Sequence, residues 1–270
     1  MIVISGSPFD IAKIIGDYPA DGIERQLLEQ LSASTARYQY DSVEQLQFEL
    51  RLRKEIVDTA WALYGSDLGF AVFYQSKCDP AYWVRLGNGG FQLRNGVKSS
   101  DAIKDIFING RKYATECATA MLIVYYGALL NIFHEDTFNR LFPSIYLMNF
   151  HGIDPLLREV GTPKKAADIL LGDRGYFKNP DVDPKTPQWQ GENVIVLPEE
   201  LYYGHGLGVA DAEKIIRALN MNRWPGADRS AYLMDAVARP DFTKLANIYL
   251  NAPAHPVTLY WRPFPPAIQS

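Results

Sequence analysis

Residues 115–133 read TECATAMLIVYYGALLNIF, and this stretch decides the fold. It is almost wholly apolar over several helical turns, a pattern typical of a helix buried in a protein core. Thr119, Gly127 and Asn131 interrupt the run, which is marginally short for a membrane span of ~20 apolar residues. The sequence therefore predicts a buried central helix that begins near Thr115.

A long amphipathic helix is predicted upstream of the central one. Asp41 is the expected N-cap, Glu44 stands three residues later, and apolar residues follow at helical spacing as far as Gly65. Such spacing places one apolar stripe against a core and leaves a charged face towards water. We expect this helix to cover part of the central one.

Runs of aromatic and β-branched residues predict the strands, over residues 70–74, 82–86, 91–94, 145–150, 194–197 and 202–209. The second and third form a hairpin across Asn88-Gly89-Gly90. A short helix over 103–108 is expected to begin at the cap Ser100, and another helix begins at Asp211. Residues 161–190 are rich in Gly, Pro, Asp and Lys and predict a long ordered loop.

The order of elements, helices between groups of strands, favours an α+β domain with the central apolar helix packed on a mainly antiparallel sheet. No internal repeat or linker divides residues 1–250, which we expect to form a single domain. Residues 251–270 hold five prolines among aromatic residues, which disfavours a helix and predicts an extended arm. Its aromatic residues favour docking on its own domain, and docking on a partner is the alternative.

Composition narrows the function classes. The 270-residue chain is 47% hydrophobic with a formal net charge of −4, and its Lys and Arg residues are scattered, so nucleic acid and anionic membranes are not expected partners. Residues 1–6 lack the pattern of a signal peptide, which favours a cytoplasmic protein. The two cysteines have neither zinc-site spacing nor the pattern of a disulfide framework.

Cys117 is the candidate nucleophile because it falls in the first turn of the apolar helix. Free backbone amides and the positive end of the helix dipole would favour its thiolate there. The commoner alternative is a cysteine packed in the core, and the residues alone do not separate the two. Cys78 lies in a loop at a strand end and looks dispensable.

Three further side chains are candidate acid–base groups. Glu116 precedes Cys117, and Glu192 stands directly before an apolar strand; either can be a solvated charge, or a buried carboxylate with a raised pKa. His205 lies in Gly-His-Gly-Leu-Gly, where glycines leave the imidazole unobstructed. Cys117, Glu192 and His205 thus form a possible set of nucleophile, acid–base group and orienting group.

A group of motifs, taken together, resembles the bacterial spore-coat transglutaminases, the protein-glutamine γ-glutamyltransferase family. The motifs are Phe48-Glu49-Leu50, Leu52-Arg53, Tyr113 to Ala120, Gly172-Asp173, Tyr176 to Pro180, Trp189 to Ile195, Gly204 to Gly208 and Ser230 to Leu233. Their order and spacing also match, over roughly residues 1–240, so the likeness extends over a whole domain.

The resemblance implies a single α+β domain with a papain-like (NlpC-like) core. It implies a calcium-independent enzyme, without metal or organic cofactor, that cross-links Gln and Lys side chains of spore coat proteins in the mother cell. By position, Cys117 matches the family nucleophile and Glu192 its partner carboxylate. Glu116 matches a second glutamate that can replace Glu192 as base, and His205 a nearby histidine.

In the implied reaction, Cys117 forms a thioester with a substrate Gln, and a Lys amine then displaces it to give an isopeptide bond. Phe70, Tyr176 and Trp189 match the aromatic walls of a tunnel that excludes water; their plain alternative is core packing. Two other functions stay open: a papain-like cysteine amidase or peptidase that uses water, and a non-catalytic coat scaffold protein.

Overall fold

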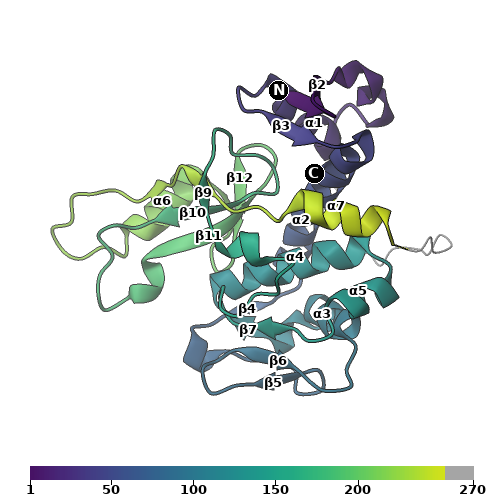
Figure 1. The fold of residues 1–270 in the computed structure, drawn as a ribbon. Helices are drawn as coiled ribbons and strands as arrows, with labels where there is room; N and C mark the ends of the chain where they lie inside the picture. Colours follow the sequence, from purple (N-terminus) through teal and green to yellow (C-terminus); the bar gives the residue numbers. More distant parts are fainter. Residues whose placement is uncertain (253–270) are drawn as a thin grey trace.

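The computed structural model describes residues 1–252, which form a mixed α+β fold (Figure 1). Its N-terminal unit has no counterpart among the predicted elements. It holds a small sheet in the order β2-β1-β3, in which β1 pairs in parallel with β3, and the helix α1, which packs on α2. The bounds are β1 Ile2–Ile4, β2 Ser7–Pro8, 3-10 helices Ile11–Lys13 and Ile15–Asp17, α1 Ile23–Ala33 and β3 Tyr38–Tyr40.

Two long helices, α2 (Val43–Tyr64) and α4 (Cys117–Ile132), pack against each other at the centre of the molecule (Figure 1). Every α4 residue after Cys117 is buried, so the predicted central helix is confirmed. The end of α2 at Gly65 is also confirmed, but its N-cap is Ser42 rather than Asp41, because the Ser42 hydroxyl accepts the Gln45 amide.

A five-stranded antiparallel sheet, in the order β13-β12-β11-β10-β14, packs its β11 strand against α4. Alternate residues of a strand face opposite sides: Ile195 enters the large core with α2 and α4, and Val194 a smaller core with α6. The bounds are β10 Arg174–Lys178, β11 Gly191–Val196, β12 Leu201–Gly204, β13 Gly208–Asp211, α6 Ala212–Asn220 and β14 Tyr232–Leu233.

Smaller elements surround the two helices. The predicted hairpin is confirmed as β5 and β6, and β8 extends it to three strands. The strand predicted over 70–74 is wrong beyond Phe70, where a 3-10 helix follows. The bounds are β4 Gly69–Phe70, 3-10 helix Phe73–Gln75, β5 Trp83–Arg85, β6 Phe91–Leu93, α3 Ser99–Ile108, 3-10 helix Gly110–Lys112, β7 Ala114–Thr115, α5 Glu135–Leu141 and β8 Tyr146–Leu147.

Two other predictions need correction. The predicted loop 161–190 contains the strand β10. Within the main sheet, β10 lies between β11 and β14. The strand predicted over 202–209 is a hairpin, β12 and β13, and its turn uses Gly206 at φ +104°, a left-handed conformation that suits glycine. The remaining bounds are 3-10 helix Arg158–Gly161, β9 Lys164–Lys165, 3-10 helix Pro187–Trp189, β15 Ala236–Val237 and α7 Phe242–Leu250.

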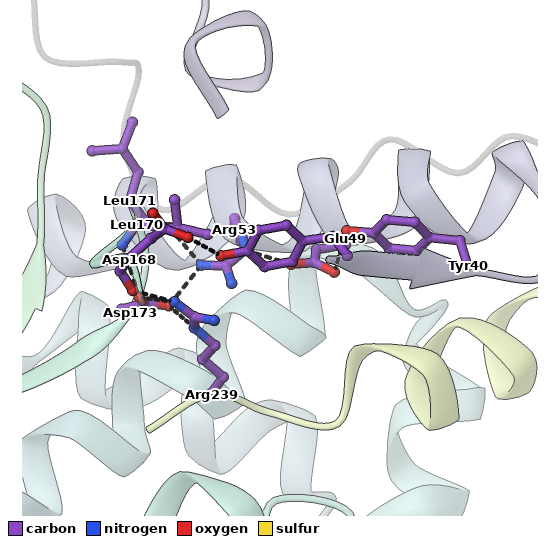
Figure 2. Close-up of polar contacts among 9 residues, drawn as sticks. Tyr40, Glu49, Arg53, Asp168, Leu170, Leu171, Asp173 and Arg239 are labelled. Carbon is purple, nitrogen blue, oxygen red and sulfur yellow. Dashed lines mark hydrogen bonds and ion pairs between the residues drawn. The ribbon is translucent and has the colours of Figure 1, made fainter. Parts of the chain in front are cut away.

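A buried ion network joins α2 to the start of β10 (Figure 2). The Arg53 guanidinium binds Glu49 on its own helix and Asp173, with a nitrogen–oxygen distance of 2.8 Å to each. Arg239 binds both carboxylate oxygens of Asp173, at 2.7 and 2.8 Å, and Tyr40 donates its hydroxyl to Glu49. Two cations and two carboxylates therefore fix the segment that enters β10.

Within residues 1–252, no helix combines the length and apolarity that a membrane crossing requires. The arm predicted over 251–270 lies, from residue 253 on, outside the described residues.

Candidate functional site

Cys117 is the first residue of α4, immediately after the short strand β7, which pairs in parallel with β4. Glu116 is the N-cap of α4. Its carboxylate accepts the amides of Ala118 at 2.5 Å and Thr119 at 2.8 Å, and it also accepts the Thr119 hydroxyl. The amides that were expected to favour a Cys117 thiolate are therefore largely taken by Glu116.

Glu192 and Asn193 lie next to each other on β11, the strand that faces α4. The Asn193 side-chain amide donates to Cys117 Sγ, with Nδ2 at 3.4 Å from the sulfur. Glu192 is only 5% exposed, and within the described residues its Oε1 atom has no hydrogen-bond partner. A Cβ atom on Gly204 would lie 2.9 Å from Glu192 Cγ, so the glycine makes room for this carboxyl.

The protonation states of Cys117 and the two glutamates depend on one another. Burial first, then the charges of Glu192 and Glu116, raises the pKa of the Cys117 thiol to about 12, against a smaller lowering by hydrogen bonds from Asn193. Burial, and then Glu116, raises the pKa of Glu192 well above its ordinary value. Burial and the two carboxylates therefore oppose the thiolate that the start of the helix was expected to favour.

His205 is buried in the turn between β12 and β13, where both ring nitrogens have polar neighbours. Nε2 lies 3.1 Å from the Gly69 carbonyl oxygen, and Nδ1 lies 3.3 Å from the Tyr203 hydroxyl. Burial lowers the pKa of His205 to about 4, so its imidazole is neutral at pH 7. These contacts join the hairpin to β4 and do not include Cys117 or Glu192.

The three predicted aromatic residues differ in burial and in their neighbours. Tyr176 is largely buried, and burial, followed by Cys117 and Glu192, raises its pKa to about 12. Phe70 is 45% exposed, with its ring centroid 6.0 Å from that of His205. Trp189 is half-buried in a 3-10 helix and packs on the small core beside α6.

Arg174 was not a candidate from the sequence. It is 3% exposed on β10, and its Nη1 donates to Asn193 Oδ1 at 2.6 Å. Its Nε donates to the Val160 carbonyl at 2.9 Å, and its guanidinium carbon lies 4.3 Å from the Phe150 ring centroid. The sequence does not indicate that this arginine is buried, because its burial depends on where β10 lies in the sheet.

Residues 1–252 contain no group of three or more His, Cys, Asp or Glu side chains arranged to hold a metal ion.

Comparison with known proteins connects this geometry to a family. The family model described as "Protein-glutamine gamma-glutamyltransferase" matches residues 1–249. Proteins of that name from Bacillus cereus (strain 03BB102) and Bacillus mycoides (strain KBAB4) are 43% and 44% identical to this chain, over 87% and 81% of it and 83% and 78% of their own lengths. A solved structure of a transglutaminase from Geobacillus stearothermophilus, without its C-terminal extension, matches at 46% identity with a TM-score of 0.72. The match covers 76% of this chain and 97% of that one.

Proposed function

Because the chain belongs to the protein-glutamine γ-glutamyltransferase family, we propose that it joins Gln to Lys side chains of proteins through a thioester on Cys117. One observation carries this proposal: Cys117, at the start of a buried helix, is hydrogen-bonded by Asn193, and the neighbour of Asn193 on β11 is the buried carboxyl Glu192, whose Oε1 has no hydrogen-bond partner among residues 1–252. A nucleophile and a proton acceptor in one water-poor site are what acyl transfer needs.

In the first step, the proton of the Cys117 thiol passes to the Glu192 carboxylate as the sulfur attacks the γ-carboxamide carbon of a substrate Gln. Because its pKa is raised, the Glu192 carboxylate accepts a proton more readily than an ordinary glutamate does. The backbone amide of Cys117, which Glu116 does not engage, is available to the developing oxyanion. Glu192 returns the proton to the leaving nitrogen, ammonia departs, and the thioester remains.

In the second step, a substrate Lys amine attacks the thioester carbon and loses a proton to Glu192. Glu116 is the second candidate base, although its carboxylate already accepts two backbone amides. The Cys117 sulfur leaves and recovers a proton, and an isopeptide bond joins the two proteins. Phe70, Tyr176 and Trp189 are proposed to line the path to the sulfur and to limit the competing attack by water.

We assign His205 a supporting role within this proposal. Its neutral ring joins the β12–β13 hairpin to the Gly69 carbonyl, close to Phe70, and so holds one wall of the path. A group with a pKa of about 4 is also a poor base near pH 7.

The setting is proposed from the family resemblance: calcium-independent cross-linking of spore coat proteins, first in the mother cell and then in the coat. The proposed steps use only side chains of this chain and call for no cofactor. A cysteine at the start of a buried helix, packed on an antiparallel sheet that carries its partner, supports a papain-like core. We propose that residues 1–250 form the catalytic domain and 251–270 a separate arm.

The test is the incorporation of a fluorescent primary amine into a Gln-rich protein, with a chelator present. We expect incorporation by the native chain and by Cys78→Ala, the matched control that removes the other cysteine, and none by Cys117→Ala. Ammonia release without incorporation would instead identify an amidase. Neither product from the native chain would favour a scaffold protein, and activity that required added Ca²⁺ would refute the calcium independence.

A further inference from the structure

Arg174 is a buried cation on β10. Within residues 1–252, no carboxylate lies within ion-pair distance of its guanidinium, whose partners are a backbone carbonyl, the Asn193 amide oxygen and the face of an aromatic ring. Its neighbour Asp173, by contrast, binds two arginines. A buried charge left without an opposite charge costs stability, so its position calls for a reason.

The guanidinium fixes which way the Asn193 amide points. Arginine has only donors, so the Asn193 atom that faces Arg174 must be the acceptor Oδ1. The Nδ2 group of the same amide is then directed at Cys117 Sγ, 3.4 Å away. Arg174 therefore selects the one amide orientation in which the sulfur meets a hydrogen-bond donor.

We propose that Asn193 is a catalytic residue, whose Nδ2–H stabilises the negative charge that develops on Cys117 Sγ and on the adjoining oxyanion, and that Arg174 is the positioning residue that aims it. This inference rests on the proposed acyl-transfer function. A donor already fixed before reaction stabilises developing charge without reorganisation at the moment of reaction. The cation behind the amide strengthens the effect, because it polarises the N–H towards the sulfur.

The surroundings of Arg174 hold it rigidly enough for this task. Its backbone exchanges two hydrogen bonds with Ala238, at 3.1 and 2.9 Å, and Asp173 immediately before it is fixed by Arg53 and Arg239. Its side chain is held by the Val160 carbonyl and the Phe150 ring. The ion network of Figure 2 thus anchors the strand from which Arg174 reaches Asn193.

The sharpest variant is Asn193→Asp, which keeps an acceptor for Arg174 but replaces the donor facing the sulfur with a carboxylate oxygen. We expect kcat/KM for amine incorporation to fall by about 100-fold or more, the typical loss for one such donor. The pH midpoint of Cys117 alkylation by iodoacetamide should also move upward. The thermal unfolding midpoint should not fall, because the new carboxylate gives Arg174 an opposite charge. Native-like kcat/KM and an unmoved alkylation profile would refute the catalytic role.

Arg174→Gln and Arg174→Lys test the positioning role. Gln removes the charge and Lys keeps it, so alkylation at a fixed pH should be slowest in Gln and intermediate in Lys, with kcat falling more than KM rises. Lys165→Gln, an exposed charge removal on β9, is the matched control and should leave both readouts unchanged. If Arg174→Gln does not fold, the Lys variant decides. Activity losses that only follow the folded fraction, with an unmoved alkylation profile, would reduce Arg174 to a structural residue.

These outcomes are separate from a failure of the proposed function. If the native chain incorporated no amine, that function would fail, but the alkylation profiles would still show whether Asn193 controls the Cys117 thiol.

Discussion

Two buried polar clusters lie next to each other at the start of β10, and they differ in whether their charged groups form ion pairs. In the ion network of Figure 2, Asp173 is fully buried and shared by Arg53 and Arg239, while Glu49 binds Arg53 and Tyr40. One residue further along, the cluster around Cys117 holds the carboxyls Glu116 and Glu192 and the cation Arg174. Among residues 1–252, none of these three groups forms an ion pair.

The contrast separates charges that hold the structure from charges that serve the reaction. A buried ion pair approximately repays its desolvation when both partners are present and well hydrogen-bonded, as in the network. Unpaired buried groups reduce stability and persist where a reaction uses them. Removing one carboxylate charge from each cluster should therefore have opposite effects on stability.

Glu192→Gln should cause the largest loss of activity, about 10²- to 10⁴-fold in kcat, because the proposed base is removed. The same change should raise stability. The pKa of Glu192 is raised on folding, so the unfolded chain loses this proton first, and stability falls as pH rises from its ordinary value towards the raised one. A glutamine lacks this penalty. The free energy of unfolding of the variant, measured in urea, should therefore exceed that of the native chain by a growing amount as pH increases. A less stable variant at pH 8 would contradict the interpretation of Glu192 as a strained, functional group.

Asp173→Asn should instead destabilise the fold, by roughly 3–5 kcal/mol, because it removes the carboxylate that binds both Arg53 and Arg239. The free energy of unfolding from urea denaturation measures this loss. The matched control is Glu159→Gln, which breaks an exposed pair with Lys164 and should change stability by less than about 1 kcal/mol. Equal losses in the free energy of unfolding for the two changes would show that the network does not stabilise the fold.

His205→Gln should change how stability depends on pH. The folded pKa of about 4 lies below the ordinary value of 6.5, so acidification protonates the unfolded chain first and lowers the stability of the native protein. Between pH 7 and pH 5 this contribution amounts to roughly 2 kcal/mol. Glutamine does not titrate, so the variant should lose that much less over the same interval. Parallel stability curves for the two proteins would show that His205 is not kept neutral by burial.

Gly204→Ala should have the smallest effect, several-fold on kcat, which we estimate as about 1 kcal/mol. The added methyl would stand 2.9 Å from Glu192 Cγ and 3.0 Å from Oε1, and the carboxyl must move to accept it. Steady-state kinetics of amine incorporation should show the loss in kcat, with KM little changed. Gly175→Ala on β10 is the control, because its Cβ would make only ordinary contacts, at 3.4 Å from the nearest side chains.

Much of the fold could be predicted because its helices carry strong local signals. The apolar run of α4, the β5–β6 hairpin around Asn-Gly-Gly and the cap of α6 at Asp211 are properties of neighbouring residues. The strand β10 escaped prediction because its buried positions include Arg174 and Gly175, which a hydrophobic pattern does not count. The β12–β13 hairpin was predicted as one strand, because the glycines that bend the chain there are also tolerated in extended backbone.

The sequence by itself determined that Cys117 lies in the first turn of a buried helix, because helix burial follows from the apolar residues that come next to it. Its motifs also pointed to the family. Only the tertiary structure decided the state of the thiol, since burial and the charges of Glu192 and Glu116 set its pKa. It alone also brought Asn193 to the sulfur across 76 residues of chain, with Arg174 behind it. Electrostatic coupling depends on distance in space and on exclusion of water, and neither can be read from the order of residues.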